Sequence, residues 1–558
     1  MSRTGSQVLL DSLHEEGVEY IFGIPGTLTL PFYDSLIDFP NIYPIVNRHE
    51  QGAAFAADGY SRVSGKTGVV FTVPGPGGTN IATALQSSKE DSVPVVAITS
   101  ALSDAMRHKS AIHDVDMENA LASCVKKVFV PNKVSEIKAY VEAAFVWANE
   151  GRPGPVQIVM KANLFKAEEE KQIVSTIVPS PDPAPAIDES KLDEIVELLL
   201  KANKPIIYAG SGVVVAKAEK LLQTLALKLG APVITSIKGR GVLSEEDPIS
   251  FGLPSFVGCE DMLKESDLCL ALGTGFGQFS TSYYKMPMTN NLMQIDIAED
   301  RLGRNYPTIL SIQAEINLCL QGILKRLEDV APSANTESLY RIKSSRSLYK
   351  ERLDTFMSNE NNPPFHGLFV MKTIRDVMPP NTVFLSDSSA TQSWLMEEAF
   401  TVFQPNSILL SEAYQSMGYA LGASIGAKIG APERPVCGII GDGSFTMVCG
   451  ELAAAVSHSL HIIIVIFNDG KYGALRHSQK YVYGERYIAT DINNPDFVTL
   501  AKSFGAKGHK ILSKNDLAES LDIALHEKHV HIIDCPIEPD VLSTKWEKSV
   551  SVFNNEKQ

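Results

Sequence analysis

Cysteine and long apolar runs are both scarce in this sequence. Its 558 residues include seven cysteines, which are scattered and never form a CxxC pair; this indicates buried thiols in a reducing compartment rather than a disulfide framework. The longest unbroken apolar runs, such as 462–467, are far shorter than the roughly 20 residues of a membrane span. The first residues include Asp11 and no long apolar stretch, unlike a secretory signal. We therefore expect a cytoplasmic protein with no membrane segment.

Basic residues are also few. Lys and Arg number 50 against 65 for Asp and Glu, a net charge of −15. Nucleic-acid and anionic-membrane binders need a basic surface, so neither partner is expected. Apolar residues make up 44% and charged residues 21%, which is ordinary globular usage and predicts a large buried core. At roughly 150 residues per domain, the length suggests three to four domains.

Two changes in composition divide the chain into three blocks. The first is the proline-rich run 179–185, which is typical of an extended linker. The second runs from about residue 330 to 364, is polar, and includes a predicted connecting helix over 339–357. The predicted domains are an N-terminal domain over 1–175, a central domain over 188–329 and a C-terminal domain over 365–540.

Each block alternates short β-branched runs with segments of helical length. Runs that are apolar on both faces and separated by helices are typical of a buried parallel sheet. The fold prediction is α/β, with three doubly wound parallel-sheet domains. Such sheets bind ligands at the carboxyl ends of their strands, so function is sought in the loops after the runs. The predicted strands are 68–73, 93–99, 155–160, 205–209, 232–235, 268–272, 292–297, 382–386, 436–440, 462–467 and 531–535.

Two oxygen-bearing clusters follow neighbouring predicted strands of the third block. Gly441-Asp442-Gly443-Ser444 follows the run 436–440, and a helical stretch is predicted over 450–458. The run 462–467 then ends in Asn468-Asp469-Gly470-Lys471. Glycines let backbone N–H groups approach a phosphate, and a carboxylate is a ligand suited to magnesium. The two strand ends are therefore predicted to share one ion.

The order GDGSF, one helix, then FNDGKYG resembles the thiamine-diphosphate motif, which starts with GDG and closes with NN. The resemblance implies that magnesium is held by Asp442, Asp469 and the carbonyl of Lys471. Gly443 and Ser444 would then hold the diphosphate. The sequence departs from the motif at Asp469, where the family has Asn. The extra negative charge is expected to tighten magnesium or to alter metal preference.

The first block carries a second part of this resemblance. Its Glu50 opens a helix rich in small residues; Phe22-Gly23-Ile24-Pro25-Gly26 precedes it, and the stretch 72–80 follows it. In this order, the pieces resemble the pyrimidine-binding domain of the decarboxylase and acetolactate-synthase branch of thiamine-diphosphate enzymes. The similarity extends from about Gly17 to Pro536, and Glu50 falls on the catalytic glutamate. The cofactor contacts implied in this way are Gly26, Thr27, Gly75, Asn80, Ser389, Thr391, Gln415, Met417, Tyr472 and Gly473.

The implied chemistry explains why a glutamate is needed. A carboxyl group beside the aminopyrimidine ring shares a proton with it, so the ring's amino group can act as the base at the thiazolium carbon. Such a role requires a buried Glu50 with a raised pKa. The cofactor then serves as an electron sink for an α-keto carbonyl. Met417 matches the apolar side chain that holds the cofactor in its bent shape. Because the glutamate and metal motifs of this family act on one cofactor from different subunits, the resemblance implies a homodimer or homotetramer.

Three positions bear on the substrate, and they do not agree on one subfamily. His113 lies where acetolactate synthases have a catalytic Gln, and a histidine there could donate a proton and favour simple decarboxylation. The stretch 472–476 is similar to benzoylformate decarboxylase, but that enzyme's two histidines align with Val73 and Ser280. A phenyl-bearing substrate is therefore not expected. Ser478 stands where biosynthetic acetolactate synthases carry a specificity Trp.

The central block resembles a family domain that holds FAD in some members and is empty in others. Its segment 271–277 lacks the charges of the Arg-rich segment found in flavin-binding synthases, which counts against FAD and leaves it as an open alternative. The favoured reading is decarboxylation of pyruvate with transfer of the two-carbon unit to a second keto acid. The alternatives are a decarboxylase that releases an aldehyde, a 2-hydroxyacyl-CoA lyase, and, more remotely, a non-catalytic homologue that binds the cofactor.

Overall fold

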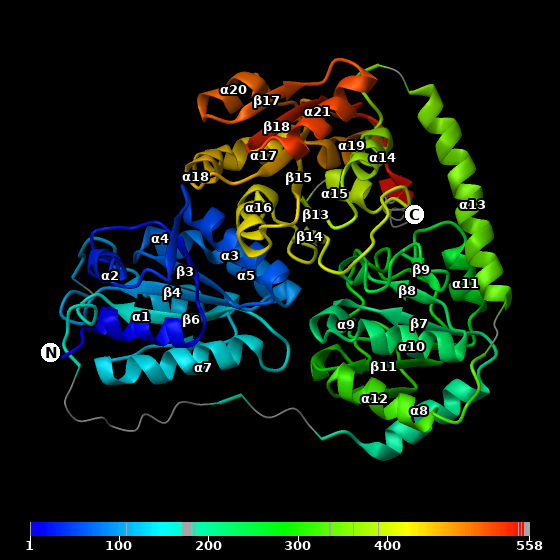
Figure 1. Cartoon of the computed structure of the whole chain (residues 1–558), viewed down its shortest axis with the longest axis horizontal. Helices are drawn as coiled ribbons and strands as arrows, with labels where there is room; N and C mark the ends of the chain where they lie inside the picture. Colours follow the sequence, from blue (N-terminus) through cyan, green and yellow to red (C-terminus); the bar gives the residue numbers. More distant parts are fainter. Residues whose placement is uncertain are drawn as a thin grey trace.

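Three parallel sheets organise the computed structural model, which describes residues 2–107, 109–169, 180–181, 186–333, 336–360, 362–388, 390–544, 546–547 and 550–551. Within those residues each sheet has six strands, and all of its strand pairs are parallel. Figure 1 shows the N-terminal sheet in blue and cyan, the central sheet in green, and the C-terminal sheet in yellow to red. The predicted α/β class with three doubly wound domains is confirmed.

The N-terminal sheet has the strand order β2-β1-β3-β4-β6-β5. Its strands are β1 (Tyr20–Gly23), β2 (Tyr43–Val46), β3 (Gly68–Thr72), β4 (Val95–Ala101), β5 (Val128–Phe129) and β6 (Val156–Lys161). Its helices are α1 (Gly5–Glu15), α2 (Leu30–Leu36), α3 (Glu50–Ser64), α4 (Pro76–Asn80), α5 (Ala82–Asp91), α6 (Met117–Ala120) and α7 (Ile137–Asn149), with short 3-10 turns η1 (Ala122–Cys124) and η2 (Val134–Glu136).

The central sheet has the order β12-β11-β10-β7-β8-β9. Its strands are β7 (Pro205–Ala209), β8 (Val233–Thr235), β9 (Ser250–Gly252), β10 (Leu268–Leu272), β11 (Leu292–Asp296) and β12 (Leu310–Gln313). Around it lie α8 (Glu189–Lys201), α9 (Ser211–Val215), α10 (Glu219–Leu229), α11 (Cys259–Glu265), α12 (Ile316–Arg326), η3 (Ile237–Gly239) and η4 (Glu299–Arg301). The long helix α13 (Thr336–Asn359) then leads to the C-terminal domain along one side of the molecule (Figure 1).

The C-terminal sheet has the order β14-β13-β15-β16-β18-β17. Its strands are β13 (Val383–Ser386), β14 (Ile408–Leu410), β15 (Val436–Gly441), β16 (Ile462–Asn468), β17 (Lys507–Lys510) and β18 (Val530–Pro536). Its helices are α14 (Gly367–Val377), α15 (Ala390–Leu395), α16 (Tyr419–Gly430), α17 (Asp442–Val448), α18 (Leu452–Ser457), α19 (Gly473–Tyr481), α20 (Phe497–Ser503) and α21 (Lys514–His526), with η5 (Cys449–Glu451) between α17 and α18.

The apolar runs identified in the sequence form the central strands of these sheets. Each of the eleven predicted runs coincides with a strand to within two residues at either end, and the predicted connecting helix lies within α13. The strands without a predicted run are β1, β2, β5, β9, β12, β14 and β17. Most of them are short or lie at a sheet edge, where one face stays polar and the run of apolar residues is broken. The proline-rich run 179–185 lies outside the described residues except for residues 180 and 181.

Helices α3 and α16 join the N-terminal and C-terminal domains, and Figure 1 shows them side by side. Both are built from small residues, so their backbones approach closely. A Cβ atom on Gly426 would lie 1.7 Å from the carbonyl oxygen of Ala56, and one on Gly59 would lie 2.2 Å from that of Ala423. One apolar core therefore runs across both domains, from Phe55 on α3 to Phe445 on α17. The C-terminal domain shares a second core with the central domain.

The helices of the described residues give no sign of a membrane-spanning part. Not one of them combines the length and the apolar character that a bilayer crossing demands. The seven cysteines are all free thiols, and five of them are buried.

Candidate active site

The carboxylate of Asp442 joins the two halves of the predicted metal motif. Asp442 is the first residue of α17, directly after β15, and is 1% exposed. Its Oδ1 accepts a hydrogen bond from the backbone N–H of Gly443 at 2.7 Å. Its Oδ2 accepts one from the N–H of Gly470 at 2.7 Å, in the loop after β16. The parallel register of β15 and β16 therefore brings both predicted clusters to the same sheet edge.

The second predicted ligand, Asp469, lies close enough to Asp442 for their charges to interact. Burial, followed by repulsion from Asp442, raises the pKa of Asp469 to about 7. Burial also raises the pKa of Asp442, against the effect of its hydrogen bonds. Two neighbouring buried carboxylates are stabilised by a cation, and their hard oxygens suit magnesium. The donor set therefore fits the expected metal.

The metal site offers few protein side chains. Among the described residues, no group of three or more His, Cys, Asp or Glu side chains could hold a metal ion. Magnesium commonly takes one or two carboxylates and completes its shell with water and phosphate oxygens, so two aspartates are enough for it. The ammonium group of Lys471 pairs with Asp491. The group of Lys471 that is predicted to bind the metal is its backbone carbonyl, which this ion pair does not involve.

Asn494 belongs to this cluster, although sequence reasoning did not identify it. Its Nδ2 donates to Oδ2 of Asp442 at 2.6 Å and to Oδ1 of Asn468 at 3.0 Å. It therefore bridges the ends of β15 and β16. The Asn493-Asn494 pair lies in a loop well beyond the predicted motif, and no strand or helix pattern next to it indicated a role.

The residues predicted to hold the diphosphate lie around this aspartate pair. A Cβ atom on Gly443 would lie 2.7 Å from Cε1 of Tyr472, and one on Gly473 would lie 3.0 Å from Oδ2 of Asp469. A larger residue at either position would therefore press on the Tyr472 or the Asp469 side chain. Ser444 is buried next to them and hydrogen-bonds to Asp387. Backbone N–H groups at the start of a helix are donors that suit a phosphate; of those in α17, the N–H of Gly443 donates to Asp442 in this structure.

Asp387 holds the turn that carries Met417. It follows β13, is fully buried, and accepts backbone N–H groups of Gly418 at 3.0 Å and Ala420 at 2.6 Å. Burial raises its pKa to about 6 despite these hydrogen bonds. Gln415 adopts a left-handed conformation with φ 55° and accepts the hydroxyl of Ser388 at 2.8 Å. Met417 itself is partly exposed.

The other two predicted contacts after β13 have different outcomes. Thr391 is buried, and its hydroxyl donates to the carbonyl oxygen of Asp387 at 3.5 Å. Ser389 lies outside the described residues. Thr391 therefore lies beside the Asp387 turn, and the role predicted for Ser389 stays a prediction.

Glu50 is the first residue of α3 and is partly buried in the single chain. Its Oε2 accepts a hydrogen bond from Nδ2 of Asn80 at 2.9 Å. A Cβ atom on Gly77 would lie 3.2 Å from Oε1 of Glu50. Asn80, predicted from the resemblance as a cofactor contact, thus touches the glutamate itself in this structure.

His113 packs against the loop that flanks Glu50. It is exposed, adopts a left-handed φ of 67°, and its Cα would lie 3.0 Å from a Cβ atom on Gly75. Gly75 lies two residues before Gly77, the neighbour of Glu50. The two predicted catalytic residues, Glu50 and His113, therefore both contact the loop that carries Gly75 and Gly77.

The remaining N-terminal prediction concerns the loop after β1. A Cβ atom on Gly26 would lie 2.4 Å from Cγ1 of Val73, so this loop packs against the residue before Pro74-Gly75. Thr27 is exposed on the same loop. Gly26 and Thr27 therefore lie near the end of β3, close to the loop that carries Gly75 and Gly77.

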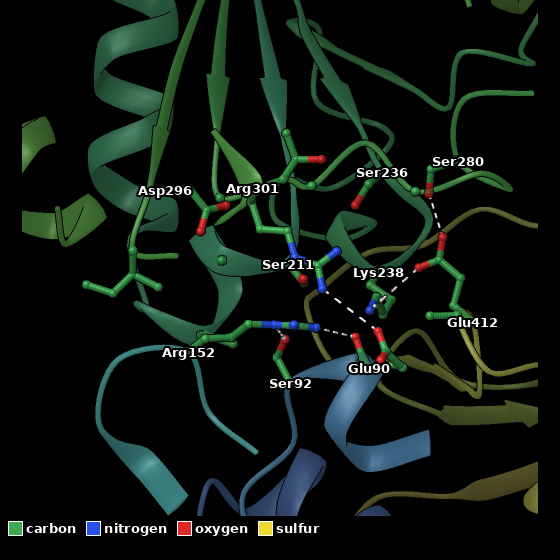
Figure 2. Close-up of a pocket in the computed structure, with 18 of the residues that line it drawn as sticks. Glu90, Ser92, Arg152, Ser211, Ser236, Lys238, Ser280, Asp296, Arg301 and Glu412 are labelled. Atoms are coloured by element: carbon green, nitrogen blue, oxygen red, sulfur yellow. Dashed lines mark hydrogen bonds and ion pairs between the residues drawn. The ribbon is translucent and has the colours of Figure 1, made fainter. Parts of the chain in front are cut away.

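A separate cavity of about 650 Å³ lies between the three domains. It opens at the carboxyl ends of β7, β10 and β11, and strand order reverses between β7 and β10. Such reversal points are the usual ligand crevices of doubly wound sheets. Figure 2 shows the guanidinium groups of Arg152 and Arg301 both directed toward Glu90, whose carbonyl oxygen accepts from Arg152 at 2.6 Å and whose carboxylate lies 3.8 Å from Arg301. Ser211 and Asp296 line the same cavity.

Basic and acidic side chains both line this cavity, namely Arg152, Lys238, Arg301 and Arg304 together with Glu90, Glu150, Asp296, Glu315 and Glu412. Burial and the neighbouring Arg301 lower the pKa of Arg152. Nε of Arg301 is buried and has no hydrogen-bond partner among the described residues. The segment 271–277 supplies no charge, as expected from the sequence, but Arg152, Arg301 and Arg304 bring charge from other segments. Sequence reasoning missed these arginines because they are far apart along the chain.

The far wall of the cavity comes from the C-terminal domain and the central domain. Ser280 donates its hydroxyl to Oε1 of Glu412 at 2.6 Å, and Lys238 lies 3.8 Å from Oε2 of the same carboxylate (Figure 2). Gln415 also lines this wall. The cavity therefore reaches the segment that carries Met417.

Comparison with known proteins identifies all three domains. Residues 3–121 match the thiamine pyrophosphate enzyme N-terminal TPP binding domain, residues 192–323 the central domain, and residues 387–535 the C-terminal TPP binding domain. A probable acetolactate synthase large subunit of Methanococcus aeolicus is 31% identical, over 96% of this chain and 92% of the relative.

Two further relatives carry similar names. A probable acetolactate synthase large subunit of Methanocaldococcus jannaschii is 30% identical over 96% of this chain and 92% of its own. The acetolactate synthase isozyme 2 large subunit of Escherichia coli is 29% identical over 97% of this chain and 96% of its own. With every domain matched and nearly the whole length aligned, the chain belongs to the thiamine-diphosphate-dependent enzyme family.

Proposed function

We propose that the protein uses thiamine diphosphate and magnesium to decarboxylate a pyruvate-like 2-oxo acid and to join the remaining two-carbon unit to a second keto acid. The observation that carries this proposal is that one chain holds both a pair of aspartates suited to magnesium and a glutamate at the start of a helix. The Asp442 and Asp469 carboxylates meet at the end of two strands, and Glu50 begins α3 beside Asn80. Similarity to proteins named acetolactate synthase, over nearly the whole length, favours carboligation.

Each part of the site has a proposed role. Asp442, Asp469 and the carbonyl of Lys471 hold magnesium, and Gly443 and Ser444 bind the diphosphate. The bound cofactor supplies an electron sink for the carbon that loses carbon dioxide. Glu50 holds the proton at the aminopyrimidine nitrogen, with Asn80 orienting its carboxylate. Met417, on the turn fixed by Asp387, would be the apolar side chain that contacts the cofactor.

His113 supports the alternative of an aldehyde-releasing decarboxylase. His113 is exposed and contacts Gly75, two residues before the Gly77 that neighbours Glu50. From there its imidazole could donate a proton to the product carbon before a second keto acid binds. A 2-hydroxyacyl-CoA lyase is the other catalytic alternative, and the cavity between the domains, with Arg152, Arg301 and Arg304 in its lining, is the feature compatible with it. A non-catalytic homologue would be expected to have lost Glu50 or Asp442, and this chain retains both.

The active enzyme is proposed to be a homodimer or homotetramer in the cytoplasm, with neither nucleic acid nor membrane as a partner. In such an assembly, Glu50 of one chain would serve the cofactor held by the metal residues of its partner. The partial exposure of Glu50 in the single chain is compatible with this arrangement. The seven free cysteines agree with a reducing compartment.

The cavity between the domains is proposed to take a nucleotide with a diphosphate group. Arg152 and Arg301 both reach Glu90 there, and a diphosphate is a second anion that two neighbouring guanidinium groups bind through charge-assisted hydrogen bonds. Asp296, at the end of β11, and Ser211, after β7, are suited to the ribose hydroxyls. FAD is one nucleotide with such a diphosphate. ADP corresponds to the part of FAD that lacks the coloured flavin ring.

Proton NMR of the purified protein with pyruvate, thiamine diphosphate and magnesium tests the reaction. Acetolactate is the expected product, because the two-carbon unit is transferred to a second pyruvate. A mixture lacking magnesium serves as the control. Acetaldehyde without acetolactate would contradict carboligation and support the decarboxylase. No turnover of pyruvate would contradict the proposed donor.

Glu50→Gln tests the proton relay. The amide keeps the size of the side chain and its contact with Asn80 but cannot exchange the proton, so turnover should fall roughly 10²- to 10⁴-fold. Cofactor affinity, measured by calorimetry, should change little. Glu16→Gln, on an exposed helix end, is the control. Full activity of Glu50→Gln would rule out the role assigned to Glu50.

Asp442→Ala tests the metal site. Loss of the carboxylate should abolish magnesium-dependent binding of thiamine diphosphate, measured by calorimetry with and without magnesium. Asp491→Asn removes an exposed carboxylate nearby, whose partner is the ammonium group of Lys471, and should keep nearly the full affinity. An unchanged affinity in Asp442→Ala would refute the site.

Arg301→Ala tests the cavity between the domains. ADP and FAD should each bind the unmodified protein in calorimetry, and the variant should bind roughly 10- to 100-fold more weakly, because a charge-assisted hydrogen bond is lost. Arg326→Ala, which removes an arginine paired with Glu189 and Asp193 in the same domain, should bind normally. Absence of binding by both nucleotides would contradict the proposal, and a flavin absorption spectrum of the purified protein would identify FAD.

A further inference from the structure

The carboxylate of Glu451, in the C-terminal domain, accepts hydrogen bonds from the three residues that directly precede Glu50. Glu451 ends η5, directly after α17, the helix that begins at Asp442. Its Oε1 accepts the backbone N–H of Arg48 at 3.0 Å and that of His49 at 2.8 Å. Its Oε2 accepts Nδ2 of Asn47 at 2.8 Å. Glu451 is 2% exposed, so these three donors replace water around a buried carboxylate.

The three donors lie in the connection from β2 to α3, immediately before the glutamate. His49 is the N-cap of α3, and Glu50 is its first residue. Backbone N–H groups before and at a helix start have no partner within the helix, so another group must accept them. Glu451 satisfies two of them and thereby fixes the direction in which the chain enters α3.

Neighbouring contacts hold the same connection against the same segment. The N–H of Val46 donates to Nε2 of His458 at 3.1 Å, and the guanidinium of Arg48 donates to the hydroxyl of Ser457 at 3.2 Å. A Cβ atom on Gly52 would lie 2.5 Å from Cδ of Glu451. Only glycine therefore lets the first turn of α3 approach the carboxylate this closely.

We propose that Glu451 is a positioning residue for Glu50. It anchors the β2–α3 connection to the C-terminal domain, so that the first turn of α3, and with it the Glu50 carboxyl group, is held in one position on the surface of the N-terminal domain. The inference rests on the proposed role of Glu50. Because Glu451 contacts Asn47, Arg48 and His49, its effect on Glu50 is transmitted through the backbone.

Glu451→Gln is the first test. One oxygen of the carboxylate becomes an NH₂ group, which faces donors and cannot accept from them. Amide exchange of the 45–55 segment, measured by deuterium uptake in the full-length protein without added cofactor, should accelerate. In the loaded enzyme, proton exchange at the thiazolium carbon and kcat should both fall roughly 10- to 100-fold, because small displacements of a catalytic group are costly. KM and the Kd for thiamine diphosphate should stay within about twofold, since the residues proposed to bind substrate and cofactor are unchanged.

Two further variants separate positioning from general loss of structure. Asn47→Ala removes only the side-chain donor and should show the same split between kcat and Kd, to a smaller extent. Glu398→Gln alters another carboxylate that accepts a backbone N–H across a domain boundary, from Val257 at 3.1 Å, and should leave exchange at the thiazolium carbon unchanged.

The outcomes distinguish this inference from the function on which it rests. Normal exchange at the thiazolium carbon in both Glu451→Gln and Asn47→Ala, with Glu50→Gln inactive, would overturn the positioning role alone. Normal exchange in Glu50→Gln as well would overturn the proposed function together with this inference. If Glu451→Gln does not fold, Asn47→Ala decides: faster uptake in 45–55 with a lower kcat supports the role, and an unchanged kcat overturns it.

Discussion

The packing of α3 against α16 is the contact on which the rest of the structure depends. Glycines 59, 422 and 426 bring the two backbones together, with no room for a side chain at any of the three. Close approach of two helices excludes water from their backbones and gives extensive van der Waals contact. It also sets the distance between the domain that carries Glu50 and the domain that carries Asp442. A sequence without small residues at these positions would hold the same domains further apart.

Buried carboxylates also hold the domains together next to the contact between α3 and α16. Oδ1 of Asp58, on α3, accepts hydrogen bonds from Nε of Arg62 at 2.7 Å and from the hydroxyl of Tyr419, on α16, at 3.0 Å. Asp91, at the end of α5, accepts Lys238 of the central domain at 2.9 Å and the N–H of Glu412 in the C-terminal domain at 3.1 Å. Burial raises the pKa of Asp91, but Lys238 and Arg62 outweigh it and leave the pKa below its ordinary value.

These buried groups connect the central cavity to the candidate cofactor site. Lys238 and Glu412 line the cavity, and Glu412 lies three residues before Gln415 on the turn that carries Met417. Asp91 holds the start of this segment and Asp387 holds its end. Removing one partner from such a network leaves an uncompensated buried charge, which is why networks of this kind stay rigid. The three domains therefore behave as one support for the segment 411–420.

The sequence by itself determined the α/β class, the central strands and the two strand-end clusters. Apolar runs such as 436–440 and 462–467 are legible because both faces of a central strand are buried, and GDG and NDG follow them directly. Only the tertiary structure decided what surrounds these clusters. Asn494 reaches Asp442, Arg152 reaches Arg301, and Glu451 reaches the start of α3 across 402 residues, from Glu451 to His49. No local pattern encodes such partners, because each depends on how the strands order and how closely two helices pack.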